Sequence, residues 1–173
     1  MKINVEKCAQ ILKEQDNILI LTHAHPDGDT LGCGFALCRA LLKCGKKARV
    51  ICADEIQKKF DYLYSDLEMP DFKEKYIVAV DVATENLLGD LKEQYGGKIN
   101  LCIDHHGTND EYSEYLSKNQ VVAMLNNFSD KHALADVSKG DYIQELKNSG
   151  RWIENPEEKK EKNMFKKKKN DTN

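Results

Sequence analysis

Residues 18–30, ILILTHAHPDGDT, join the pattern of a buried strand to a polar loop and indicate the class of fold. The first four residues, Ile18–Leu21, are a continuous apolar run, which is typical of a strand buried on both faces of a parallel sheet. The seven residues after Thr22 contain two histidines, two aspartates, a proline and a glycine, a composition that disfavours any regular element. Side chains that suit metal chemistry therefore follow directly behind a buried strand.

Outward from this stretch, the chain alternates between helical and strand patterns up to residue 103. Asn4 is predicted to cap a helix that ends near residue 15, and Thr30 to cap a second helix that Gly45 stops. Strands separated by helices imply right-handed crossovers, so the sequence predicts an α/β fold with a parallel sheet and helices on both faces. Further strands are predicted at 48–53, 76–82 and 99–103, and further helices at 55–65 and 85–94.

Composition limits the classes of protein that need to be considered. The 173 residues suit one domain of ordinary size, and the net charge of −3 includes a basic stretch at 147–173, so the rest of the chain is more acidic. An acidic body disfavours a general polyanion-binding surface unless cations are bound. Six cysteines without a CxxC pair indicate buried hydrophobic residues in a reducing compartment. With no N-terminal signal and only short apolar runs, we expect a cytoplasmic protein with no membrane partner.

Three of the predicted strands end in residues of the types that bind metals. Ligands of an open parallel sheet gather at the carboxyl ends of its strands, so these residues are expected to converge on one rim. Each group has an ordinary alternative, because a single aspartate after a strand is more often a turn former and HPDGD alone reads as a polar turn. Their conjunction favours metal chemistry. The residues are His23, Asp27 and Asp29 after the first strand, Asp81 after the third, and Asp104, His105 and His106 after the fourth.

The order of these motifs resembles the DHH phosphoesterase superfamily. The motifs are H-x-H-P-D-G-D, a strand-terminal aspartate and I-D-H-H-G, and the resemblance covers about residues 3–116. The flanking segments LTHAHPDGDTLGCGFAL and CIDHHGTNDEY are most similar to its branch of oligoribonucleases and 3′-phosphoadenosine 5′-phosphate phosphatases. The resemblance implies two divalent cations, usually Mn²⁺, with Mg²⁺ or Co²⁺ as alternatives.

The resemblance also implies a set of ligands. His23 and Asp27 would hold the first ion, Asp29 and His105 the second, and Asp81 would bridge both at the catalytic centre. Imidazole and carboxylate together suit Mn²⁺, while the absence of a thiolate cluster disfavours a structural zinc site.

Four further residues are expected to act without binding the metal. His106 is the expected catalytic residue that faces the substrate, as a hydrogen-bond donor to phosphate or an acid for the leaving oxygen. Asp104 is expected to orient a neighbouring imidazole, and His25 to act behind the ligands or on the substrate side. Asp54 is expected to cap the helix that follows it.

The function that follows is a metal-dependent phosphoesterase acting on short RNA or on a nucleoside bisphosphate. Two alternatives stay open: a manganese-dependent inorganic pyrophosphatase of the same superfamily, and a catalytically inactive remnant that binds a partner or has no function. The sequence leaves the oligomeric state undetermined.

The chain departs from the family pattern after Tyr115. The family leads us to expect a strand there, then the start of a helix and a D-T-G type segment with the last aspartate of the second site, and no such segment follows. A glycine-rich GGGH-like motif is missing too. We therefore expect an incomplete DHH domain at 1–116, an atypical and partly helical extension at 117–153 and a disordered charged tail at 154–173. Such truncation is expected to lower activity, since fewer contacts position the substrate.

Overall fold

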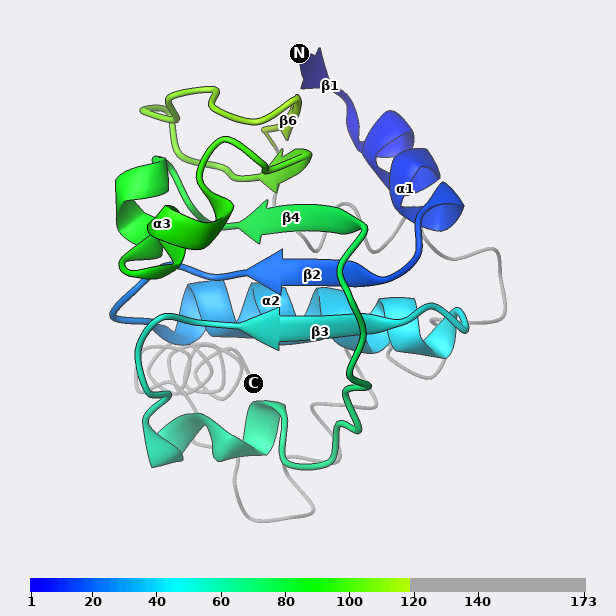
Figure 1. Cartoon of the computed structure of the whole chain (residues 1–173), viewed down its shortest axis with the longest axis vertical. Coiled ribbons are helices and arrows are strands. Elements are labelled where there is room, and N and C mark those ends of the chain that lie inside the picture. Colours follow the sequence, from blue (N-terminus) through cyan, green and yellow to red (C-terminus); the bar gives the residue numbers. More distant parts are fainter. Residues whose placement is uncertain (119–173) are drawn as a thin grey trace, which may run out of the picture. The chain divides into compact units, whose positions relative to one another are not determined.

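Six parallel strands form one sheet in residues 1–118, the part of the chain that the computed structural model describes (Figure 1). The strand order is β1-β6-β5-β4-β2-β3, and every neighbouring pair is parallel. The predicted parallel sheet is therefore confirmed. The strands are β1 (Lys2–Ile3), β2 (Ile18–Leu21), β3 (Ala48–Ile51), β4 (Tyr76–Val80), β5 (Leu101–Ile103) and β6 (Tyr115–Ser117).

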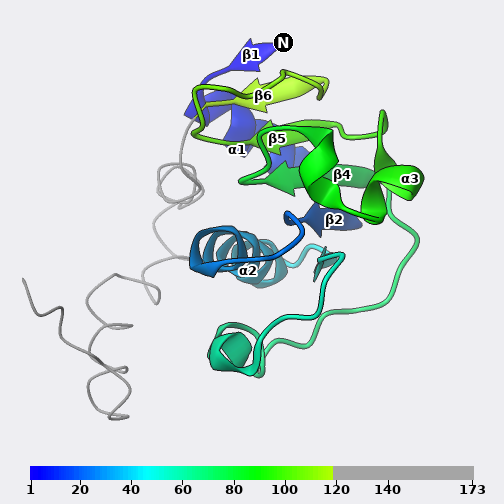
Figure 2. The ribbon, with the colours of Figure 1, turned by 90° about the vertical axis from the view of Figure 1, so that its left-hand side faces the viewer.

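Helices cover both faces of this sheet, as the sequence predicts (Figure 2). On one face lie α1 (Val5–Glu14) and α2 (Gly28–Lys43), and on the other lie η2 (Glu85–Leu88) and α3 (Leu91–Tyr95). Every residue of β2 and of β4 is buried, because both strands are central and are covered from both sides. This explains their unbroken apolar sequences.

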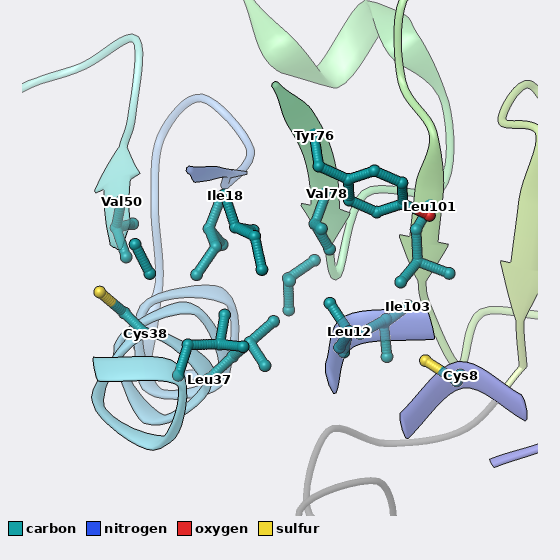
Figure 3. Close-up of a cluster of buried hydrophobic side chains, with 14 of the residues drawn as sticks. Cys8, Leu12, Ile18, Leu37, Cys38, Val50, Tyr76, Val78, Leu101 and Ile103 are labelled. Atoms are coloured by element: carbon teal, nitrogen blue, oxygen red, sulfur yellow. The ribbon is translucent and has the colours of Figure 1, made fainter. Parts of the chain in front are cut away.

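The residues of each central strand alternate between two apolar clusters. Ile18 and Ile20 of β2 pack with side chains of α1 and α2, while Leu19 and Leu21 belong to the cluster under η2 and α3. Figure 3 shows the first cluster, where Leu12 of α1 and residues of α2 face the strands. Apolar burial on both faces holds the carboxyl ends of the strands in place, and the loops of the site start from these ends.

Local capping explains where the two long helices begin. Asn4 caps α1 as predicted, and its side-chain oxygen accepts from the Lys7 amide at 2.9 Å. The prediction that Thr30 caps α2 is wrong: Asp27 is the N-cap and accepts from the amides of Asp29 and Thr30. The Thr30 side chain is buried, and its hydroxyl donates to the Val80 carbonyl at 3.2 Å. The cap of α2 is thus one of the proposed metal ligands.

Two predicted helices take other forms. The segment 55–65 contains a 3₁₀ helix, η1 (Lys58–Leu63), in place of an α-helix. The segment 85–94 is divided at Gly89 into η2 and α3. Gly89 has a φ of +56°, and a Cβ there would lie 3.0 Å from the Cβ of Ala24. The close approach to the loop after β2 requires glycine at this position, and the chain turns there.

The six cysteines are all free thiols. Cys8, Cys38 and Cys102 are buried, and burial raises the pKa of the Cys8 and Cys38 thiols to about 12 and that of Cys102 to about 11. Cys44 is exposed, so it does not follow the expectation of burial, because it lies at the C-cap of α2. Among the described residues, no helix combines the length and the apolarity that crossing a membrane requires.

Gly34 and Gly32 of α2 form a matched pair that tests the packing of this helix on the sheet. A Cβ on Gly34 would lie 2.9 Å from Cγ2 of Thr22, the residue before His23, whereas a Cβ on Gly32 would have no neighbour within 4 Å. Both alanine variants gain the same helix propensity, so their difference isolates the packing. We expect Gly34→Ala to be less stable than Gly32→Ala by about 1–3 kcal/mol in denaturant unfolding. Equal stabilities would show that α2 is not tightly packed against Thr22.

Candidate metal centre

The proposed ligands lie on loops that follow the carboxyl ends of β2, β4 and β5. Strands β2 and β4 are neighbours in the sheet, but the helices that follow them lie on opposite faces (Figures 1 and 2). After β2 the chain continues to α2 on one face, and after β4 it continues to η2 and α3 on the other. Neighbouring strands whose loops diverge in this way create the crevice where open α/β sheets bind ligands. The strand order also puts β4 between β5 and β2, so the loop after β4 lies between the two histidine-bearing loops.

The loop after β2 is held in place by backbone contacts. The Ala24 amide donates to the Leu87 carbonyl at 2.6 Å, and the Cys52 thiol donates to the His23 carbonyl at 3.2 Å. His23 Nδ1 lies 2.8 Å from the Ala24 carbonyl oxygen, which can only accept, so Nδ1 carries a hydrogen and Nε2 is the ring nitrogen that remains for another partner. His23 Nε2 lies 3.8 Å from Asp27 Oδ1. The free nitrogen therefore faces a carboxylate.

Asp81 follows β4, and its carboxylate is buried without full hydrogen bonding. Its side chain is only 7% exposed, its backbone has a φ of +59°, and its Oδ1 has no hydrogen-bond partner. Burial raises the pKa of the Asp81 carboxyl, and the nearby negative charge of Asp29 raises it further. A buried and unpaired carboxylate oxygen is costly unless a cation compensates it.

Two histidines of the loop after β5 approach this oxygen. His105 Nε2 lies 3.4 Å from Asp81 Oδ1 and 3.6 Å from Asp29 Oδ2, so it contacts aspartates of both other loops. The rings of His105 and His106 are adjacent, with centroids 4.5 Å apart. The Cys33 thiol donates to the other oxygen of Asp29 at 3.4 Å.

His106 is tied to Asp104, the first residue of the loop after β5. Its Nδ1 lies 2.7 Å from Asp104 Oδ1, and the Asp104 side chain is fully buried. This hydrogen bond raises the pKa of the His106 ring. Asp104 thus contacts a neighbouring imidazole, which is the kind of contact that an orienting role requires. Nε2 of His106 remains for other partners.

His25 lies outside these contacts. Its side chain is 95% exposed, and its Nδ1 and its backbone amide both contact Asp54 Oδ2, at 2.9 and 2.6 Å. The prediction that Asp54 caps the next helix is therefore wrong, because Asp54 turns back to the loop after β2, where His25 has a φ of +53°. The role of His25 stays a prediction.

Within residues 1–118, two groups of side chains have the geometry to hold a cation, and they share Asp81. In each group the ligand atoms lie within 4.8 Å of one another. Asp81 Oδ1, which has no hydrogen-bond partner, and the mixture of imidazole and carboxylate donors fit a divalent cation. The missing late aspartate falls outside the described residues. The groups are His23, Asp27 and Asp81, and Asp81, His105 and His106.

Fold and site together define a parallel α/β domain with a candidate centre for two cations at its switch point. The family model described as "DHH family, N-terminal domain" matches residues 17–148, and the chain belongs to the DHH family.

Two solved structures give the structural context. An exopolyphosphatase-related protein from Bacteroides fragilis is similar with a TM-score of 0.64 and 16% identity, covering 88% of this chain and 53% of that chain. CDC45 from Entamoeba histolytica reaches a TM-score of 0.46 and 16% identity, covering 83% and 32%. The chain spans about half the length of the first protein, and the likeness to that protein shows the fold.

Sequence reasoning missed two residues that support the site. Asn109 donates to Asp104 Oδ2, and the Tyr112 hydroxyl donates to the carbonyl of Val82, the residue after Asp81. Both lie a few residues after the DHH motif. No spacing rule assigns such an asparagine to Asp104, or connects Tyr112 to a residue that precedes it by 30 positions. Only their burial in the folded chain reveals the connection.

Proposed function

We propose that this chain is a metal-dependent phosphoesterase domain whose two cations share Asp81. The observation that carries the proposal is the buried Oδ1 of Asp81, which has no hydrogen-bond partner and lies between two histidine-bearing loops. A bound cation would compensate this oxygen. Membership of the DHH family and the donor types support the same conclusion.

In this proposal, His23 and Asp27 hold the first ion, and Asp29 and His105 hold the second. When bound, the ions lower the pKa of a coordinated water and neutralise charge on the phosphoryl group. The protein's own residues set the positions: the Ala24 carbonyl orients His23, and the start of α2 orients Asp27. Without cations, the clustered aspartates would repel a phosphate, so activity should depend on metal.

His106 belongs to the second group by geometry, but in this proposal it acts on the substrate rather than as a ligand. Its Nδ1 is near Asp81 as well as Asp104, but the 2.7 Å contact with Asp104 commits that nitrogen to donating a hydrogen. A nitrogen that carries hydrogen does not bind a metal. Its Nε2 is therefore the atom offered to a phosphate oxygen or a leaving oxygen.

We propose short oligoribonucleotides or 3′-phosphoadenosine 5′-phosphate as substrates and Mn²⁺ as the metal. The support is the likeness of the segments around HPDGD and DHHG to the oligoribonuclease branch. The free thiols favour a reducing compartment such as the cytoplasm.

The test is hydrolysis by the full chain in the presence of Mn²⁺. Three substrates are compared: 3′-phosphoadenosine 5′-phosphate, a diribonucleotide and pyrophosphate. We expect hydrolysis of at least one of the first two, and its loss on adding a chelator. Preference for pyrophosphate would favour the pyrophosphatase alternative. A folded chain that binds Mn²⁺ and hydrolyses none of the three would contradict the proposal and favour a binding role.

A further inference from the structure

Asn109 lies in the loop after β5, is 8% exposed and uses both ends of its side-chain amide. Its Nδ2 donates to Asp104 Oδ2 at 2.7 Å and to the Val82 carbonyl at 3.3 Å. Its Oδ1 accepts from the Glu111 amide at 2.8 Å. Because the Asp104 carboxylate and the Val82 carbonyl near Nδ2 can only accept and the Glu111 amide near Oδ1 can only donate, the orientation of the amide is determined.

The Asp104 carboxylate is divided between two partners. Oδ2 accepts from Asn109, while Oδ1 accepts from His106 Nδ1 at 2.7 Å and from the His106 amide at 3.3 Å. The backbone amide of Asp104 donates to the Ser117 carbonyl at 3.1 Å, which fixes the residue to β6. With the backbone held, Asn109 is the partner that fixes Oδ2 of this carboxylate.

We infer that Asn109 is a positioning residue for His106, acting through Asp104 to hold the ring so that Nδ1 donates to Asp104 and Nε2 is directed toward the substrate. The inference rests on the proposed function, in which His106 Nε2 meets the substrate. Without Asn109, Asp104 Oδ2 would be buried and would lose this donor, so the carboxylate would turn toward another donor or admit water. The ring of His106 would then lose its fixed orientation.

The contacts of Val82 separate this role from the metal centre. The Val82 carbonyl, next to Asp81, also accepts from the Tyr112 hydroxyl at 2.7 Å and from the Cys102 thiol at 3.5 Å. Removing Asn109 therefore leaves the segment after β4 held by two other donors. Asp81 keeps its position, and the affinity for metal should be preserved while the chemistry slows.

The test compares wild type, Asn109→Ala and Asn109→Leu in the full chain. Leu fills the volume of Asn without its hydrogen bonds, so it keeps the test valid if the alanine variant is unstable. We expect kcat to fall about 10- to 100-fold while the Kd for Mn²⁺ stays within about threefold. The readout independent of activity is the ¹⁵N spectrum of His106. Wild type should show a hydrogen on Nδ1 that exchanges slowly with solvent because Asp104 holds it, and both variants should show faster exchange.

Asn100→Ala is the matched control. Asn100 precedes β5, at the opposite end of the strand, and its Oδ1 accepts from the Ile77 amide at 2.9 Å. It removes an asparagine hydrogen bond of similar kind without touching Asp104. If Asn109 and Asn100 variants leave kcat and the exchange of the His106 Nδ1 hydrogen equally unchanged, the inference is overturned. If wild type hydrolyses none of the substrates, the proposed function fails, and the His106 spectrum still decides the role of Asn109.

Discussion

Asp81→Asn is expected to weaken Mn²⁺ binding by about 100-fold or more and to raise the melting temperature of the metal-free protein. The first effect follows because Asp81 belongs to both groups of potential ligands. The second follows because the wild-type carboxylate is buried with an unpaired Oδ1 close to Asp29, and asparagine keeps its shape without the charge. Asparagine also tolerates the positive φ of this position, so the substitution adds no backbone strain.

The two effects are measured by titration calorimetry with Mn²⁺ and by thermal unfolding with and without a chelator. Removing the buried charge should stabilise the metal-free protein by about 1 kcal/mol. Mn²⁺ should stabilise wild type and have little effect on the variant, since a ligand raises stability only by binding the folded state. Asp110→Asn is the control, because Asp110 is an exposed carboxylate of the neighbouring loop. A destabilised Asp81→Asn protein that binds Mn²⁺ normally would contradict the proposed centre.

The second large effect is expected from His23→Ala, which should lower the affinity for Mn²⁺ by roughly 100-fold. The ring of His23 is oriented by the Ala24 carbonyl and offers Nε2 to the first group. Its neighbour His25 is the matched control, since it lies two positions away, is 95% exposed and contacts Asp54 instead. His25→Ala should therefore bind Mn²⁺ with nearly the wild-type affinity.

The measurement is again calorimetry, with metal-dependent thermal shifts as a second readout. Equal losses from the two histidine variants would mean that the loop as a whole, rather than one ring, determines affinity. A greater loss of Mn²⁺ affinity from His25→Ala than from His23→Ala would show that His25, and not His23, is the ligand. The comparison is sensitive because both variants remove the same side chain from the same loop.

Much of the fold was predictable from local patterns. The apolar runs of β2 and β4 indicated strands covered on both faces, and Asn4 indicated the start of α1. The cap of α2 was misplaced by three residues, since both Asp27 and Thr30 are good capping types and only the contact of Thr30 with Val80 separates them. The helix expected at 85–94 was divided because Gly89 passes close to Ala24, a contact between distant segments.

Local patterns were enough to associate each polar motif with the strand before it, because the two are adjacent in the chain. The sequence therefore identified His23, Asp27, Asp29, Asp81 and His105 as candidates, and it placed them at one edge of a parallel sheet. Three features required the folded chain. Asp81 lies between the two histidine-bearing loops because β4 lies between β5 and β2. His25 contacts Asp54, and Asn109 donates to Asp104. The physical reason is that the order of strands and the partner of each polar side chain depend on hydrogen bonds between segments far apart in sequence, which no local pattern encodes.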